Sequence, residues 1–109
     1  MSSTRIVREI NVDRFKSILS EYRFKIRVSS HALDHLSGYQ RSIFTEKDLL
    51  KVFLSEIPRA VGLQKNNCYS SFYQRKHGYL RIVFKVERWV EIITFINMEK
   101  LPNIGRLEG

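Results

Sequence analysis

Basic and aromatic side chains are interleaved in one segment of this 109-residue chain, residues 57–88. The segment carries seven Lys or Arg residues against one acidic residue, Glu87, whereas the whole chain has 19 Lys or Arg and 11 Asp or Glu. Lys and Arg bind nucleic acid by neutralising phosphates and releasing counterions, and aromatic rings stack on unpaired bases. The residues expected to contact nucleic acid are Arg59, Lys65, Tyr69, Lys76 and Arg88. Two alternatives fit the same pattern: a solubilising charge over an aromatic core, or a surface for an acidic protein partner.

Few other residues have a type and spacing suited to chemistry. His31 and His35 are four residues apart, a spacing that suits metal binding on one side of a helix. A third ligand would have to come from elsewhere in the chain, so no metal site is predicted. Cys68 is the one cysteine, and without a base beside it we interpret it as a small buried apolar residue. Trp89 is interpreted as a core residue that closes a hairpin, with an interface anchor as the alternative.

The composition limits the kinds of protein that can hold these residues. A chain of 109 residues with 43% hydrophobic residues fits a single domain, residues 1–109, with an ordinary core. No run of about 18 uncharged apolar residues is present, and the N-terminal segment lacks the apolar core of a signal peptide. One cysteine excludes an internal disulfide. We therefore expect a basic cytoplasmic protein that needs no cofactor and no membrane, with its oligomeric state left open.

Hydrophobic spacing predicts that residues 11–56 are mainly helical. The predicted elements are helices over residues 11–22, 31–36 and 45–56 and a short strand near residues 24–28. Asn11 or Asp13 can cap the first helix, and Gly38 is expected to end the second. Thr45 followed three residues later by Asp48 is a typical start for the third.

After Pro58 the hydrophobic period changes to two, which predicts an antiparallel meander over residues 59–97. Gly78 lies in a turn where a permissive φ is needed. A short connection over residues 87–89 would place Lys85 opposite Glu91. The fold class expected is α+β, with N-terminal helices on one face of a four- to five-strand antiparallel sheet. The other sheet face is expected to be partly in solvent.

Two stretches of the chain resemble known families. The strand Tyr79-Leu-Arg-Ile-Val-Phe84, followed by the hydrophobic strand 90–96, resembles the RelE-like toxin superfamily. The segment from Ser30-His-Ala32 to residues 44–50, Phe-Thr-Glu-Lys-Asp-Leu-Leu, is similar to a related group of small uncharacterised domains that begin with a His-Ala helix. Together these stretches span about residues 26–98.

This resemblance implies a RelE-like sheet and a toxin that cleaves messenger RNA, usually at the ribosome, held in check by an acidic antitoxin protein. The function expected on this ground is metal-independent endoribonuclease activity, which needs a general base, a general acid and cations for the phosphorane charge. Arg81 corresponds to the strand arginine that would stabilise that charge. The other catalytic candidates, taken from their expected position on the same sheet, are Lys85, Arg75, Tyr73 and His77.

The chain also departs from the family pattern at two places. The His-Ala group typically has Arg where His35 stands, and active toxins have Arg or Tyr where this chain has Asn97 to Lys100. A degenerate relative is therefore one alternative. The other is a non-catalytic RNA- or DNA-binding module that uses the same basic strands.

Overall fold

The computed structural model of the chain describes residues 5–102. Within these residues the chain is α+β, with six strands and three helices. In chain order the elements are β1 (Ile6–Ile10), α1 (Val12–Glu21), β2 (Ile26–Val28), α2 (Gly38–Ile43), α3 (Glu46–Ser55), β3 (Ala60–Gln64), β4 (Tyr69–Arg75), β5 (Gly78–Val86) and β6 (Val90–Met98).

All six strands belong to one sheet with the order β1-β3-β4-β5-β6-β2. Strands β3 to β6 form the predicted antiparallel meander, and Lys85 lies opposite Glu91 as predicted. The expectation of four or five strands, all antiparallel, was wrong at the two edges of the sheet. β1 adds antiparallel to β3, and β2 adds parallel to β6, so the sheet is mixed. β1 buries only Ile6 and Ile10, which gives it no period-two signal.

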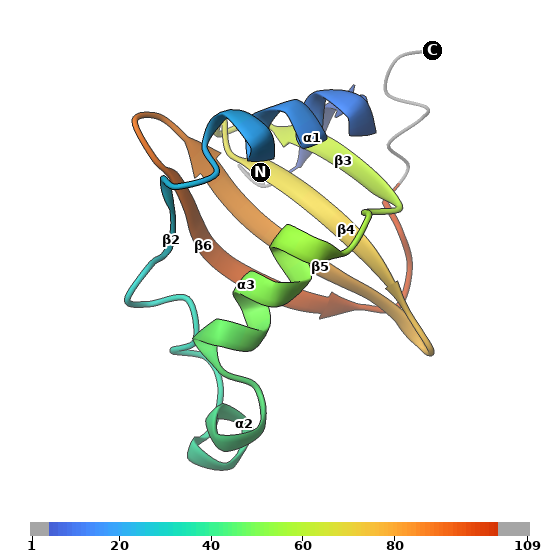
Figure 1. Cartoon of the computed structure of the whole chain (residues 1–109). Coiled ribbons are helices and arrows are strands. Elements are labelled where there is room, and N and C mark those ends of the chain that lie inside the picture. The colour runs from blue at the N-terminus through green and yellow to red at the C-terminus, as the bar shows by residue number, and fades with distance from the viewer. Residues whose placement is uncertain (1–4, 103–109) are drawn as a thin grey trace.

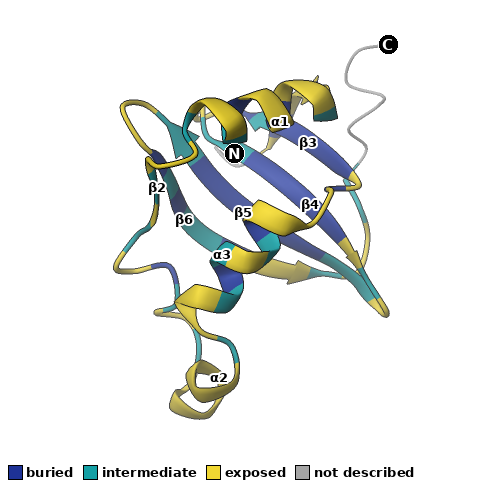
Figure 2. Cartoon of the chain, in the orientation of Figure 1, coloured by how far each residue is buried: buried dark blue, intermediate teal, exposed yellow. Residues whose placement is uncertain are grey.

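α1 and α3 lie across the same face of the sheet, and the main core is between them and the central strands (Figure 1). The ring of Phe53 on α3 makes edge contacts with Phe15 on α1 and Phe84 on β5, with ring centroids 5.6 and 4.9 Å apart. Figure 2 shows the central strands buried and the outer surfaces of the helices exposed. No helix within residues 5–102 is long and apolar enough to cross a membrane.

The segment before α3 differs from its prediction. Residues 31–36 form successive turns closed by i→i−3 hydrogen bonds, such as Asp34 N–H to the His31 carbonyl, and not a helix. Gly38 begins α2 instead of ending a helix. The physical reason is the capping box of α2, in which Ser37 and Gln40 satisfy each other's backbone N–H groups. The predicted capping box of Thr45 and Asp48 is present at α3.

A β-bulge changes which residues of β6 face the core. The register between β5 and β6 shifts between Val83 and Phe84, so β6 contains one extra residue there. Beyond the shift Phe95 joins the core, whereas Ile96 is 43% exposed. The period of two predicted for residues 59–97 would place Ile96 on the same face as Ile92, and the bulge interrupts that period within β6.

Replacing Gly78 with Ala should destabilise the protein. Gly78 has a φ of 137°, and an added Cβ would overlap the carbonyl oxygen of Met98 on the neighbouring strand. We expect Gly78→Ala to lower the free energy of unfolding by at least about 2 kcal/mol, measured by urea denaturation. Gly38→Ala is the matched control, because a Cβ at Gly38 meets no atom within 4 Å. Equal stabilities for the two variants would contradict this account of the turn.

The capping box of α3 should make stability depend on pH. Hydrogen bonds from the backbone N–H and then the hydroxyl of Thr45 lower the pKa of the Asp48 carboxyl below its ordinary 3.8. A lowered folded-state pKa gives stability that is present above pH 3.8 and is lost as pH falls through the folded pKa. Asp48→Asn should therefore be less stable than wild type above pH 3.8, and the difference should shrink in acid. Melting temperatures from about pH 6 to about pH 2 test this; a difference that stays constant would refute it.

Candidate nucleic-acid interface

The catalytic candidate Tyr73 lies on the helix side of the sheet. Its side chain is fully buried in the main core, and its hydroxyl donates to Ser71 Oγ at 3.0 Å. Burial raises the pKa of the Tyr73 hydroxyl. Side chains alternate between the two faces along β4, so Ser70 and Phe72 lie on the opposite face of the sheet. There Phe72 packs with Ile6. Tyr73 and Arg81 therefore lie on opposite faces of the sheet, which separates two of the catalytic candidates.

Arg81 does lie on the opposite face, but it is buried, with 8% of its surface exposed. Its Nε donates to Ser70 Oγ and its Nη2 to Gln64 Oε1, both at 2.8 Å. The guanidinium carbon lies 5.3 Å from the ring centroid of Phe72. Burial lowers the pKa of Arg81. The sequence predicts that this sheet face is partly in solvent, but Gln64 and Ser70 hold the Arg81 guanidinium within the structure.

The remaining catalytic candidates are spread over the two ends of the sheet. Arg75 forms a two-point ion pair with Glu56, at 2.9 and 3.2 Å. His77 is exposed in the turn between β4 and β5, whereas Lys85 lies near the other end of β5, opposite Glu91. The five candidates thus occupy both faces and both ends, and they do not share a cavity.

The topology gathers a different group of residues at one end of the sheet. Because a meander reverses at each turn, the β3–β4 turn and the β5–β6 turn lie at the same end. β2 runs parallel to β6, so β2 also begins there, and the Lys25 carbonyl accepts from Val90 N–H at 2.8 Å. We define this basic end by eight residues: Arg23, Phe24, Lys25, Arg27, Lys65, Lys85, Arg88 and Trp89.

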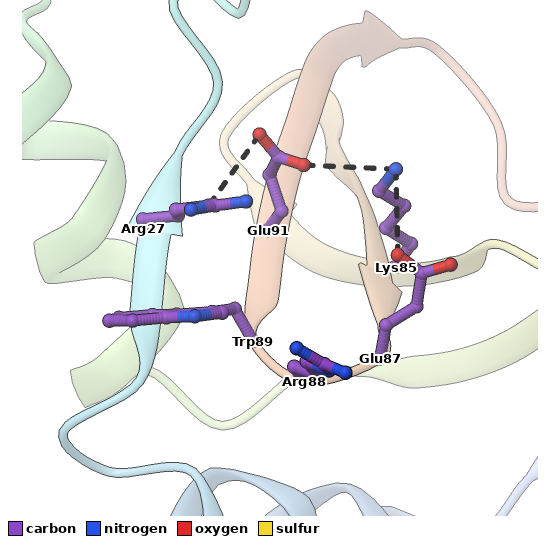
Figure 3. A pocket seen from close by; sticks show the side chains of 6 residues that line it. All are labelled: Arg27, Lys85, Glu87, Arg88, Trp89 and Glu91. Atoms are coloured by element: carbon purple, nitrogen blue, oxygen red, sulfur yellow. Dashed lines mark ion pairs between the residues drawn. The ribbon is translucent and has the colours of Figure 1, made fainter.

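Two aromatic side chains of the basic end are exposed, and each has a guanidinium over its ring. Phe24 is 82% exposed, with the Arg23 guanidinium 4.9 Å from its ring centroid. Trp89 is 42% exposed, with the Arg27 guanidinium 5.4 Å from its ring. Figure 3 shows the Arg27 guanidinium and the Trp89 indole lying one above the other. Such rings can stack on bases, and cations beside them can meet phosphates.

A first hollow of about 340 Å³ lies beside Trp89 on the Arg27 side (Figure 3). Arg27 and Lys85 both approach the Glu91 carboxylate at 3.8 Å, and Lys85 also approaches Glu87 at 3.8 Å. The side chains of both cations are about half exposed. Glu91 is 21% exposed, but ion pairs at this distance to half-exposed cations contribute little stability. A phosphate can therefore replace a carboxylate as their partner at low cost.

A second hollow of about 560 Å³ lies on the α1 side of the same loop. Its lining consists of Glu21, Tyr22, Lys25, Glu87, Arg88 and Trp89. The Tyr22 hydroxyl donates to the Glu87 carbonyl at 2.9 Å and so attaches the end of α1 to the β5–β6 loop. Within residues 5–102 no group of three or more His, Cys, Asp or Glu side chains is placed to hold a metal ion.

Only part of the basic end was expected from the sequence. Of the predicted nucleic-acid contacts, Arg88 and Lys65 lie there, whereas Arg59 and Lys76 are exposed at the other end of the sheet. Tyr69 faces the core and stacks on Phe84, with centroids 5.4 Å apart. The residues that were missed are Arg23, Phe24, Lys25 and Arg27, and Trp89 had an interface role only as its alternative. The sequence signal that could have identified this surface is an aromatic residue directly after Arg, in Arg23-Phe24 and in Arg88-Trp89.

Comparisons of the chain with protein-family models, with curated proteins and with solved structures found no match. The resemblance to the RelE-like toxin superfamily therefore stays a prediction from the sequence. The geometry of the basic end is the observation that bears on function.

Arg81→Ala should reduce stability through its buried hydrogen bonds. The change removes the guanidinium, which donates hydrogen bonds to Gln64 Oε1 and Ser70 Oγ. It also leaves space beside Phe72. We expect the free energy of unfolding to fall by about 3 kcal/mol, measured by urea denaturation. Arg59→Ala removes an exposed charge and should change stability by no more than about 0.5 kcal/mol. If Arg81→Ala were as stable as wild type, its buried contacts would not support the fold.

Proposed function

We propose that this protein binds RNA through the basic end. The observation that carries the proposal is the pair of exposed aromatic rings, Phe24 and Trp89, each with a guanidinium over it and further cations around it. RNA offers the two groups that such a surface can bind, phosphates for the cations and base faces for the rings.

The charge of the basic end supports this proposal. Within residues 5–102, six Lys or Arg side chains belong to the basic end, and the carboxylates that line its two hollows are those of Glu21, Glu87 and Glu91. Two of these carboxylates are engaged by Lys85 or Arg27 in long ion pairs that a phosphate can displace. The net charge of +8 for the whole chain adds a long-range attraction for a polyanion.

The placement of the candidate catalytic residues favours binding over cleavage. Acid–base cleavage of RNA requires the base, the acid and the charge-stabilising cation to reach one phosphate. Tyr73 is enclosed in the main core, and Arg81 is held by Gln64 and Ser70 on the other face. The endoribonuclease implied by the RelE-like resemblance therefore needs residues other than this set.

Removing two cations from the basic end should weaken RNA binding and its dependence on salt. We expect Lys65→Ala/Lys85→Ala to lower the affinity for a fluorescent RNA and to reduce the slope of log affinity against log salt by roughly 0.7 for each lost phosphate contact. The measurement is fluorescence anisotropy between about 50 and about 200 mM salt. The matched control is Arg59→Ala/Lys76→Ala, which removes the same charge from exposed residues at the other end.

Three outcomes decide the proposal. A selective loss in Lys65→Ala/Lys85→Ala supports binding at the basic end. Equal losses in the two double variants would show a general charge effect and would contradict it, as would wild-type affinity that does not respond to salt. The same mixtures, incubated in EDTA and separated on a denaturing gel, test the enzyme. Shortened RNA would move the assignment to a metal-independent ribonuclease.

A further inference from the structure

The second hollow lies between backbone segments that are joined to one another. Two contacts hold them: Lys25 is tied to β6 through its carbonyl, and Tyr22 is tied to the β5–β6 loop through its hydroxyl. The volume of about 560 Å³ is within the usual range for a small-molecule site. The hollow can therefore accept a ligand group without first being assembled.

The lining of this hollow combines an aromatic ring with polar groups of both signs. Trp89 supplies the ring, Lys25 and Arg88 supply donors, and Glu21 and Glu87 supply acceptors. A phosphate group would meet the two carboxylates at a cost in repulsion. A nucleobase has a flat face for the indole and both donors and acceptors on its edge. The mixed lining therefore fits a base better than a phosphate.

Arg27 decides which face of Trp89 is left for a base. Its guanidinium covers one face of the indole, on the side of the first hollow (Figure 3). A base that stacks on Trp89 must use the other face, and the second hollow is lined by the same indole. The cations of the first hollow, Arg27 and Lys85, are then placed for a neighbouring phosphate.

We propose that the basic end selects single-stranded RNA, with one unpaired base inserted into the second hollow and stacked on Trp89. In a duplex each base face is covered by the next base pair, so only an unpaired base can stack on a side chain. This inference rests on the RNA binding proposed above and adds the class of RNA. Duplex RNA would still contact the cations, but it would leave Trp89 without a partner.

The protein carries its own probe for this contact, because Trp89 is the one tryptophan of the chain. We expect a single-stranded oligonucleotide to quench the Trp89 fluorescence of the wild type in a saturable way. The same strand annealed to its complement should quench it much less at equal phosphate concentration. Tyr39→Leu, which changes an exposed aromatic residue of α2 outside the basic end and keeps Trp89, should preserve the quenching.

Variants of Trp89 test the size of the effect with labelled RNA and anisotropy. Trp89→Leu should weaken single-strand binding by about 10-fold, as expected for one lost base–aromatic stack, and should leave duplex binding unchanged. Trp89→Phe, which keeps a ring, should retain most of the preference. Far-UV circular dichroism and the melting temperature confirm that each variant is folded.

The two proposals fail in different ways. If neither RNA form binds in a salt-dependent manner, the proposed function is wrong. If both forms bind equally, or if bound single strands leave the Trp89 fluorescence unchanged, RNA binding stands and the stacked base is refuted. Quenching by single strands, together with loss of the preference in Trp89→Leu, establishes the inserted base.

Discussion

The parallel pairing of the three-residue strand β2 with the start of β6 is the contact on which the basic end depends. It places Arg27 beside Trp89 and opposite Glu91, although these residues are more than 60 positions apart in the chain. The hydrogen bond from Tyr22 to the Glu87 carbonyl closes the same junction from the helix side. Without this pairing the Arg23–Lys25 segment would have no fixed relation to the β5–β6 loop. The basic end is thus a product of long-range backbone pairing, and helix packing alone would not create it.

The parts of the fold that could be predicted are those whose signal is local. Period-two hydrophobicity in residues 59–86 and the pair Thr45 and Asp48 each specify their element within a few residues, and the structure has both. β1 carries no such pattern, because it lies at an edge and pairs with β3, more than 50 residues later. The bulge in β6 could not be predicted from the sequence either, because it depends on the register with β5 and on the packing of Phe95.

The candidate site was harder to predict because charge in a sequence does not say where a side chain points. The basic segment 57–88 was identified, but its two hairpin ends and its two faces could not be told apart. Arg81 alternates with apolar residues, a pattern typical of a surface cation, yet Gln64 and Ser70 accept hydrogen bonds from it inside the structure. Trp89 looked like a core residue because most hairpin aromatics are, yet the covering strand β2 is short and leaves the ring partly exposed.

The β5–β6 loop lines two hollows, and this shared lining has a thermodynamic consequence. Glu87, Arg88 and Trp89 line both the hollow on the Arg27 side and the hollow on the α1 side. A molecule that displaces these residues on one side changes the shape and charge available on the other. The two occupancies are then linked, and the linkage is reciprocal: whatever factor the first occupant applies to the affinity of the second, the second applies to the first. The same three residues thus lie at the boundary of both hollows, and only a ligand that displaces them would link the two occupancies.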